Sequence, residues 1–109
     1  MTIGVTMEKD SEKDLERRLN REIKQMGGKS VKVYNPWDVG FPDRMLLMPG
    51  GRVIFVELKS TGERPRAIQR VKHEELRALG YEVRVIDRNK QIDKLLDDLQ
   101  TPYIPEQSH

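Results

Sequence analysis

Three charged residues lie beside apolar sequence, and their types suit hydrolytic chemistry. Glu57 and Lys59 occupy alternate positions at the end of the apolar run Val53–Leu58, and Asp43 opens the preceding apolar run. Because side chains alternate along a strand, Glu57 and Lys59 share one face. A buried carboxylate and ammonium are costly unless they are paired, hydrogen-bonded or bound to a metal ion. The plainer alternative is that the strand ends here and both side chains reach water.

The turn between the two apolar runs decides whether Asp43 and Glu57 meet. If only Gly50-Gly51 form the loop, Asp43 faces Leu58 and points away from Glu57. If Pro49-Gly50-Gly51 form a three-residue loop with a left-handed glycine, Asp43 lies directly opposite Glu57. Opposed β-carbons lie roughly 4.5–5.5 Å apart, and two carboxylates at that distance repel unless a cation lies between them or one is protonated. A hard divalent cation satisfies both carboxylates, so we predict the three-residue loop.

A third carboxylate could come from the first predicted helix. Glu12 and Glu16 are four residues apart and therefore share a helix face. Glu16 also adjoins the apolar stripe that begins at Leu15 and Leu19, so it could look toward the end of the sheet. The commoner explanation for glutamates beside lysines and arginines is a solvated surface.

Polar residues farther along the chain give weaker signals. Gln69 stands near the start of the second predicted helix, where it could hydrogen-bond to a site residue, although a surface glutamine is the commoner case. His73, on the same helix, is predicted to lie on the surface, and His109 is terminal. Two histidines so placed do not have the spacing of zinc ligands.

Composition narrows the class of protein. The chain has 109 residues, 36% of them hydrophobic and 35% charged, which predicts one domain with a lean core. It has no cysteine, which excludes disulfides, thiolate zinc sites and iron–sulfur clusters. No apolar stretch approaches the ~20 residues of a membrane-spanning helix, so no membrane partner is expected. The net charge is only +2, but a basic middle and an acidic tail hint at a polyanion-binding face.

Hydrophobic periodicity and turn residues predict the elements that position these side chains. They are, in order, a helix from Ser11 to Gly27, strands over 31–34, 43–48 and 52–58, a helix from Pro65 to Leu79, a strand over 83–86 and a helix over 92–99. This order predicts an α/β fold with a mixed central sheet flanked by helices. The 52–58 strand is apolar on both faces and is therefore expected to be central.

The same pattern predicts the apolar face of the second helix and the limits of the domain. Ile68, Val71, Leu76 and Leu79 are expected to form that face. We expect an N-terminal extension over 1–10, a single domain over 11–100 and a C-terminal tail over 101–109.

Taken together, the motifs resemble those of VRR-NUC nucleases in the PD-(D/E)XK superfamily. Pro42-Asp43 and Glu57-Leu58-Lys59 match the bare superfamily pattern. The more specific match is carried by 40–44, 49–51, 55–59, Gly62, Pro65, Gln69, 76–80 and a valine-rich strand. The resemblance covers residues 11–99 and is to the small stand-alone phage and bacterial form. It implies an αβββαβ(α) restriction-endonuclease-like core and a location in the cytoplasm of a bacterial or phage-infected cell.

The resemblance implies an endonuclease that depends on Mg²⁺ or Mn²⁺ and hydrolyses DNA phosphodiester bonds. Asp43, Glu57 and the backbone carbonyl of Leu58 would hold the metal ion. Lys59 would orient or help deprotonate the attacking water and stabilise charge on the phosphate.

The resemblance also implies roles for two residues outside the strands. Glu16 lines up best with the helix acid of related Holliday-junction resolvases, while Glu12 is the alternative because it matches a glutamate often seen in the family. Either would hold a metal-bound water or a second ion. Gln69 matches a family glutamine near the active site.

Finally, the resemblance implies a homodimer that acts on branched DNA such as Holliday junctions, because opposite strands of a symmetric junction need two active sites related by a two-fold axis. The candidate phosphate contacts are Lys29, Lys32, Arg44, Arg64, Arg66, Arg70 and Lys72. Two alternatives remain open. One is a non-catalytic DNA-binding or dimerisation module on the same fold. The other is an enzyme that acts on flaps, RNA or small nucleotides, although the sequence has no Gly-rich phosphate loop.

Overall fold

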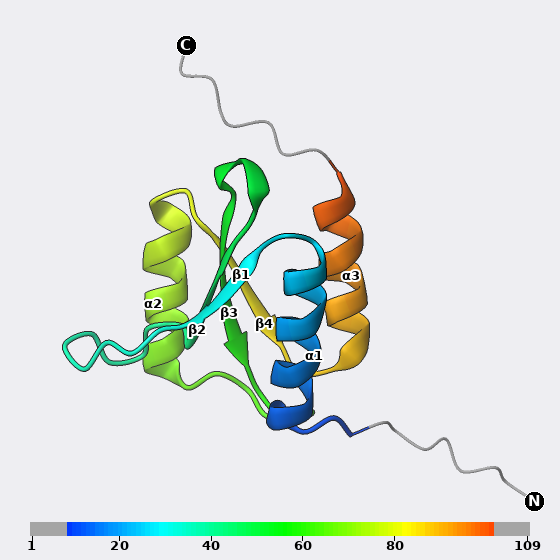
Figure 1. Cartoon of the computed structure of the whole chain (residues 1–109). Helices are drawn as coiled ribbons and strands as arrows, with labels where there is room; N and C mark the ends of the chain where they lie inside the picture. The colour runs from blue at the N-terminus through cyan, green and yellow to red at the C-terminus, as the bar shows by residue number, and fades with distance from the viewer. Residues whose placement is uncertain (1–8, 102–109) are drawn as a thin grey trace, which may run out of the picture.

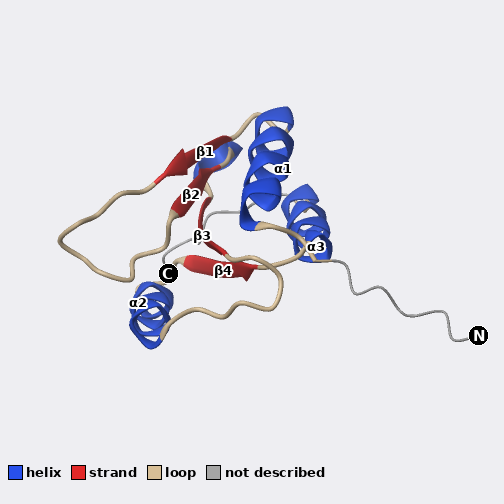
Figure 2. Ribbon diagram, turned by 90° about the horizontal axis from the view of Figure 1, so that it is seen from below, coloured by secondary structure: helices blue, strands red, loops and turns tan. Residues whose placement is uncertain are grey.

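The computed structural model describes residues 9–101 and shows a four-stranded mixed sheet with helices on both faces (Figure 1). The elements, in chain order, are α1 (Glu12–Gln25), β1 (Lys29–Lys32), β2 (Arg44–Leu47), a 3₁₀ turn (Pro49–Gly51), β3 (Val53–Leu58), α2 (Ala67–Ala78), β4 (Glu82–Ile86) and α3 (Asn89–Gln100). Helices α1 and α3 cover one face of the sheet and α2 covers the other (Figure 2). The predicted α/β class with a mixed sheet is confirmed.

The strand order places β3 inside the sheet. Strands run in the order β1-β2-β3-β4, with β1, β2 and β3 successively antiparallel and β4 parallel to β3. A parallel neighbour needs a crossover connection, and α2 supplies it between β3 and β4. Five of the six β3 residues are buried, which confirms the central position predicted from its two apolar faces.

Alternation along β3 divides the interior into two cores. Ile54, Val56 and Leu58 join the larger core between the sheet and the helix pair α1 and α3. Phe55 joins the smaller core under α2. Since side chains two residues apart share a face, Glu57 projects toward α2, as Phe55 does. A carboxylate is thereby brought to the buried side of a helix.

The start of α1 follows its predicted cap, whereas β1 is shifted from its predicted position. Ser11 Oγ accepts a hydrogen bond from the backbone N–H of Asp14 at 3.1 Å, as expected of an N-cap. The strand predicted over 31–34 instead spans Lys29–Lys32, because its ladder pairs with the four residues of β2. One further backbone bond joins Val33 N–H to Asp43 O at 2.8 Å before the chain leaves the sheet.

Helix α2 is turned differently from the sequence prediction. Of the four apolar residues expected to face the core, only Leu76 is buried, while Leu79 is 74% exposed and Ile68 and Val71 also reach the surface. The face toward the sheet carries Gln69, His73 and Leu76. These three residues have the i, i+4, i+7 spacing of one helix face, so polar groups occupy positions that apolar ones were expected to fill.

The chain termini are only partly described. Residues 1–8 and 102–109 lie outside the described residues, so most of the predicted extension over 1–10 and tail over 101–109 falls there, as does His109. Asp10, placed in that extension by the sequence, is hydrogen-bonded to the folded domain. Among the described residues, no helix has the length and apolar character needed to span a bilayer.

Candidate active site

The turn between β2 and β3 places Asp43 opposite Glu57. Gly50 and Gly51 have φ values of 85° and 88°, which glycine adopts without strain. Arg44 pairs with Val56 and Met45 with Phe55, which is the register of the three-residue loop. Extending this register by one position sets Asp43 across from Glu57, as the sequence predicted.

Asp43 and Glu57 form a pair of acids, each of which has a buried and unsatisfied oxygen. Glu57 is 3% exposed, and Asp43 Oδ1 and Glu57 Oε1 are both buried without a hydrogen-bond partner in the described part of the chain. Burial raises the pKa of Asp43 to about 6, although a backbone hydrogen bond from Leu58 opposes the rise. Burial and then the charge of Asp43 raise the pKa of Glu57 to about 7. In the absence of a cation, the protein therefore disfavours ionisation of both groups.

These two oxygens fit a divalent cation. Hard cations such as Mg²⁺ and Mn²⁺ take carboxylate and carbonyl oxygens as ligands, and a positive charge between the two acids would offset both their repulsion and their desolvation. Within residues 9–101, no three histidine or acidic side chains converge as a complete metal-binding cluster. A metal ion held by this pair would therefore need further ligands from backbone carbonyls or water.

The structure separates the two candidates for the helix acid. Glu16 Oε2 lies 2.5 Å from Arg44 Nη2, so the carboxylate of Glu16 forms an ion pair with this arginine. Glu12 instead contributes negative charge that raises the pKa of both Asp43 and Glu57. The comparison with related Holliday-junction resolvases favours Glu16, whereas the family resemblance offers Glu12, whose charge acts on the acid pair.

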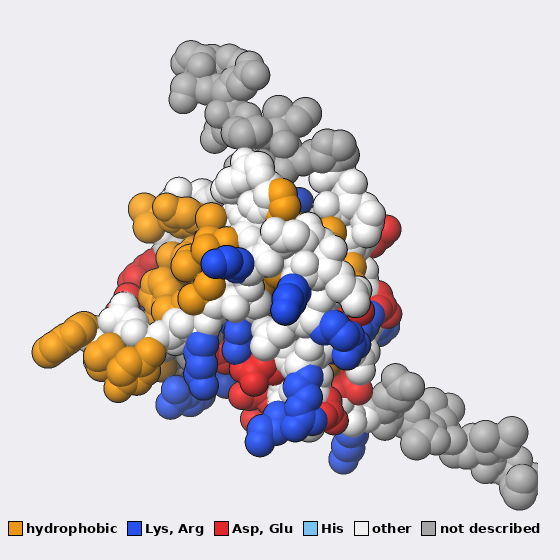
Figure 3. Space-filling view, viewed as in Figure 1, with side chains coloured by type: hydrophobic (Ala, Val, Ile, Leu, Met, Phe, Trp, Pro, Cys, Tyr) orange, Lys and Arg blue, Asp and Glu red, His pale blue; other side chains and the backbone are white. Residues whose placement is uncertain are grey.

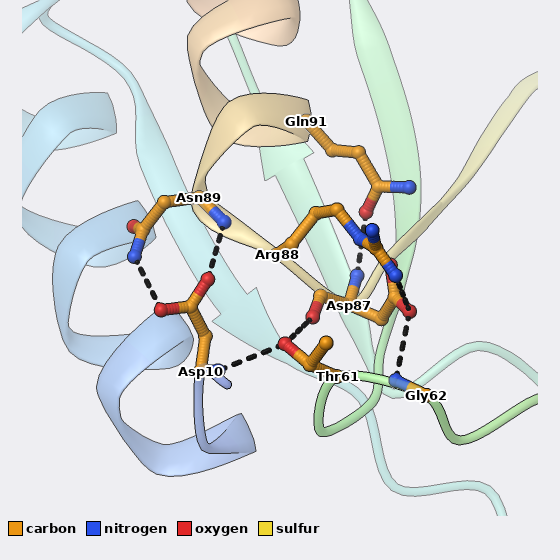
Figure 4. A network of polar contacts seen from close by, with 7 residues as sticks. All are labelled: Asp10, Thr61, Gly62, Asp87, Arg88, Asn89 and Gln91. Atoms are coloured by element: carbon orange, nitrogen blue, oxygen red, sulfur yellow. Dashed lines mark hydrogen bonds and ion pairs between the residues drawn. The ribbon is translucent and has the colours of Figure 1, made fainter. Parts of the chain in front are cut away.

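A polar network holds the start of α1 against the loop after β3 (Figure 4). The carboxylate of Asp10 accepts hydrogen bonds from the backbone N–H and the side-chain amide of Asn89, at 2.8 and 2.9 Å. The backbone N–H of Asp10 donates to Thr61 Oγ1 at 2.8 Å. Two residues later, the N–H of Glu12 donates to Ser60 Oγ at 3.1 Å. These contacts fix Glu12 near the end of β3, and sequence reasoning missed them because their partners are distant along the chain.

Three further side chains approach Glu57. Lys59 Nζ lies 3.9 Å from Glu57 Oε2, and Gln69 Nε2 donates a hydrogen bond to the same oxygen at 3.2 Å. His73 Nε2 lies 3.5 Å from Glu57 Oε1. Burial, and then the charge of Arg77, lower the pKa of His73, so its imidazole is neutral near pH 7.

The prediction that His73 lies on the surface is wrong. His73 is 2% exposed, and Gln69 is also buried rather than a surface glutamine. The reason is the rotation of α2, which turns its polar 69/73 pair toward β3. The available signal was the i, i+4 spacing of Gln69 and His73, which puts both on one helix face.

The predicted phosphate contacts divide into exposed and engaged residues. Arg44 is 6% exposed and binds Ser30 Oγ and Glu16, so its guanidinium is turned into the protein. Lys72 Nζ lies 2.9 Å from Asp38 Oδ1. The exposed members are Lys29, Lys32, Arg64, Arg66 and Arg70. Figure 3 shows Lys and Arg side chains around a group of acidic side chains at the end of the molecule where α1 begins.

Known proteins resemble this chain in both sequence and fold. No model of a protein family matches the sequence. The chain is 41% identical over 76 residues to "Putative nuclease p44" of Acyrthosiphon pisum secondary endosymbiont phage 1, a match that covers 70% of this chain and 82% of that relative. A solved structure described as a "VRR_NUC domain" superposes with a TM-score of 0.74 at 28% identity and covers 81% of this chain and 97% of that chain.

The two relatives agree with the motif resemblance. The sequence relative is named a nuclease, and the structural relative carries the same restriction-endonuclease-like arrangement of sheet and helices. The chain therefore belongs to the VRR-NUC family of nucleases.

Proposed function

We propose that the protein is a metal-dependent endonuclease that hydrolyses phosphodiester bonds in branched DNA. The observation that carries the proposal is the facing pair of carboxylates, Asp43 and Glu57, each with a buried oxygen that has no hydrogen-bond partner within residues 9–101. Two like charges buried together destabilise a fold unless a bound ligand offsets their repulsion. A divalent cation is the ligand that matches their charge and their oxygen chemistry.

The residues around this pair suit phosphodiester hydrolysis. Asp43, Glu57 and the backbone carbonyl of Leu58 would hold Mg²⁺ or Mn²⁺, which when bound polarises a phosphoryl oxygen and favours ionisation of water. Lys59 donates hydrogen bonds to the phosphate and orients the attacking water, since its ammonium is held beside Glu57. Glu12 supplies a third negative charge from α1.

Arg44 and the exposed basic residues have different roles in this proposal. Arg44 holds Glu16 and Ser30, so it supports the junction of α1 with β1 and β2 rather than contacting phosphate. Exposed Lys29, Lys32 and the arginines of the 64–70 segment bind the DNA backbone. Contacts of this kind make binding sensitive to salt and tolerant of sequence.

An exposed apolar surface supports the proposal of a homodimer. The loop–α2 patch consists of Tyr34, Trp37, Val39, Ile68, Val71 and Leu79, and Figure 3 shows hydrophobic side chains gathered over α2 and the loop between β1 and β2. Trp37 is 94% exposed. Exposed apolar side chains gathered on one side of a molecule mark an interaction site. A second copy bound there would supply the second active site that a symmetric DNA junction requires.

A cleavage panel tests the proposal. A four-way junction, a flap, linear duplex and RNA are each incubated with the protein in Mg²⁺, Mn²⁺ or EDTA, and sedimentation measures the mass of the protein. We expect a dimer that cuts the junction only in the presence of metal. Asp43→Asn should abolish cleavage but retain junction binding, while Glu63→Gln, at an exposed carboxylate, should cut normally.

Each other result contradicts a stated part of the proposal. Cleavage by Asp43→Asn would refute the metal role of Asp43. A wild-type protein that binds the junction but cuts no substrate would be a binding module. Preferential cleavage of RNA would refute the assignment of DNA as the substrate.

A further inference from the structure

Helix α2 presents to Glu57 a second polar group that the proposed chemistry does not use. His73 is almost completely buried, and its Nε2 lies 3.5 Å from Glu57 Oε1. Each of these two atoms is buried without a hydrogen-bond partner among the described residues. Buried polar atoms are rarely left unsatisfied in native proteins, so their juxtaposition calls for a functional explanation.

The neighbouring glutamine shows how α2 treats the other oxygen of Glu57. The backbone N–H of Arg66 donates to Gln69 Oε1 at 2.7 Å. This bond fixes which end of the amide is the acceptor, so the NH₂ end must face Glu57 Oε2, where it donates at 3.2 Å. Gln69 therefore fixes one oxygen of the Glu57 carboxylate, Oε2, by donating a hydrogen bond to it.

His73 lies one helical turn beyond Gln69 and faces the other oxygen. A neutral imidazole has one N–H and one lone pair. If the proton were on Nδ1, the lone pair of Nε2 would point at the lone pairs of Glu57 Oε1, and the two would repel. The carboxylate therefore favours the tautomer with the proton on Nε2. At 3.5 Å the contact is an electrostatic approach rather than a short hydrogen bond.

We propose that His73 is a positioning residue for Glu57, whose Nε2–H acts with the Gln69 amide to fix the plane of the carboxylate. Each donor approaches one oxygen, and a carboxylate oxygen has a second lone pair that remains for a cation. Groups that orient a metal ligand in this way tune the affinity for the metal. The inference rests on the proposed function, because it assumes that Glu57 binds a divalent cation.

The test measures Mn²⁺ binding by calorimetry in protein without DNA, near pH 8, together with thermal unfolding. His73→Leu puts an apolar side chain of similar size in the same space and removes the donor, whereas His73→Gln restores an N–H on a nitrogen as many bonds from the backbone as Nε2 of histidine. Leu76→Ala serves as the packing control, because Leu76 is buried on the same face of α2. We expect His73→Leu to weaken Mn²⁺ binding roughly 10-fold and His73→Gln to recover most of that loss. Leu76→Ala should lower the unfolding temperature without changing Mn²⁺ affinity.

The tautomer is tested separately in the wild-type protein. Long-range ¹H–¹⁵N NMR of the His73 ring should show the proton on Nε2, and a proton on Nδ1 would overturn the proposal whether or not the variants fold. Wild-type Mn²⁺ affinity in His73→Leu would also overturn it, as would equal weakening by Leu76→Ala. These outcomes differ from a failure of the proposed function, in which the wild-type protein would bind no Mn²⁺ or Asp43→Asn would bind it equally well.

Discussion

Glu57→Gln is expected to stabilise the metal-free protein near pH 8, although it removes a proposed metal ligand. The folded protein raises the pKa of Glu57 from 4.5 to about 7, first through burial and then through the charge of Asp43. At about 1.4 kcal/mol per pKa unit, this corresponds to roughly 3 kcal/mol of stability lost once the group is ionised. Glutamine has nearly the same shape, can still accept the hydrogen bond from Gln69 and carries no charge.

The gain in stability should depend on pH in one direction. Between pH 4.5 and about 7, the folded protein keeps the proton on Glu57 while the unfolded chain has released it. The native state therefore binds more protons, and stability falls as the pH rises through this range. The variant does not titrate at this position, so its advantage should be under about 1 kcal/mol near pH 5 and approach its full value near pH 8.

Urea unfolding followed by circular dichroism in EDTA measures both values, and equal slopes for wild type and variant would validate the comparison. Glu63→Gln is the matched control, because Glu63 is an exposed carboxylate in the loop after β3, and it should change stability little at either pH. A Glu57→Gln variant less stable than wild type near pH 8, or an equal difference at both pH values, would refute the argument that a buried charge dominates here.

Three other substitutions test the roles proposed for Glu12 and Glu16 and the backbone conformation at Gly40. Glu12→Gln is expected to lower Mg²⁺-dependent cleavage about 10–100-fold. Glu16→Gln loses its pairing with Arg44, so its main effect should be on the unfolding temperature rather than on the cleavage rate. A larger loss of cleavage in Glu16→Gln than in Glu12→Gln would instead favour Glu16 as the helix acid. Gly40→Ala should cost about 1–3 kcal/mol in urea unfolding, because Gly40 has a φ of +90° and a Cβ there would lie 2.8 Å from the backbone oxygen of Ile68. An unchanged urea midpoint in Gly40→Ala would contradict the argument that a Cβ at this position is strained.

The parts of the site that follow from local chemistry could be predicted from the sequence. The cap at Ser11 and the turn at Pro49–Gly51 depend on residues close together in the chain, and the structure has both. Turn length then sets the register, so the juxtaposition of Asp43 and Glu57 followed from the same few residues. The central position of β3 was predictable for a similar reason, because a strand that is apolar on both faces must be covered on both sides.

The parts that depend on packing between distant elements could not be predicted. Helix α2 has apolar residues on more than one side, and a sequence does not show which side meets the sheet. The hydrophobic pattern favoured Ile68 and Leu79, but the side with Gln69 and His73 is buried. The sequence left the choice between Glu12 and Glu16 open for the same reason, because it depends on where Arg44 places its guanidinium.

The short edge strand β1 limits how copies of the chain can assemble. Its outer side would present backbone donors and acceptors to any extended segment, and such edges are where sheets polymerise. Lys29 and Lys32 stand at its two ends, both exposed, so a second β1 laid alongside would bring ammonium groups together. Open-ended growth of the sheet into a fibre is thereby discouraged at this edge. The dimer that we propose would then form through a different surface, one that closes on itself after a single contact.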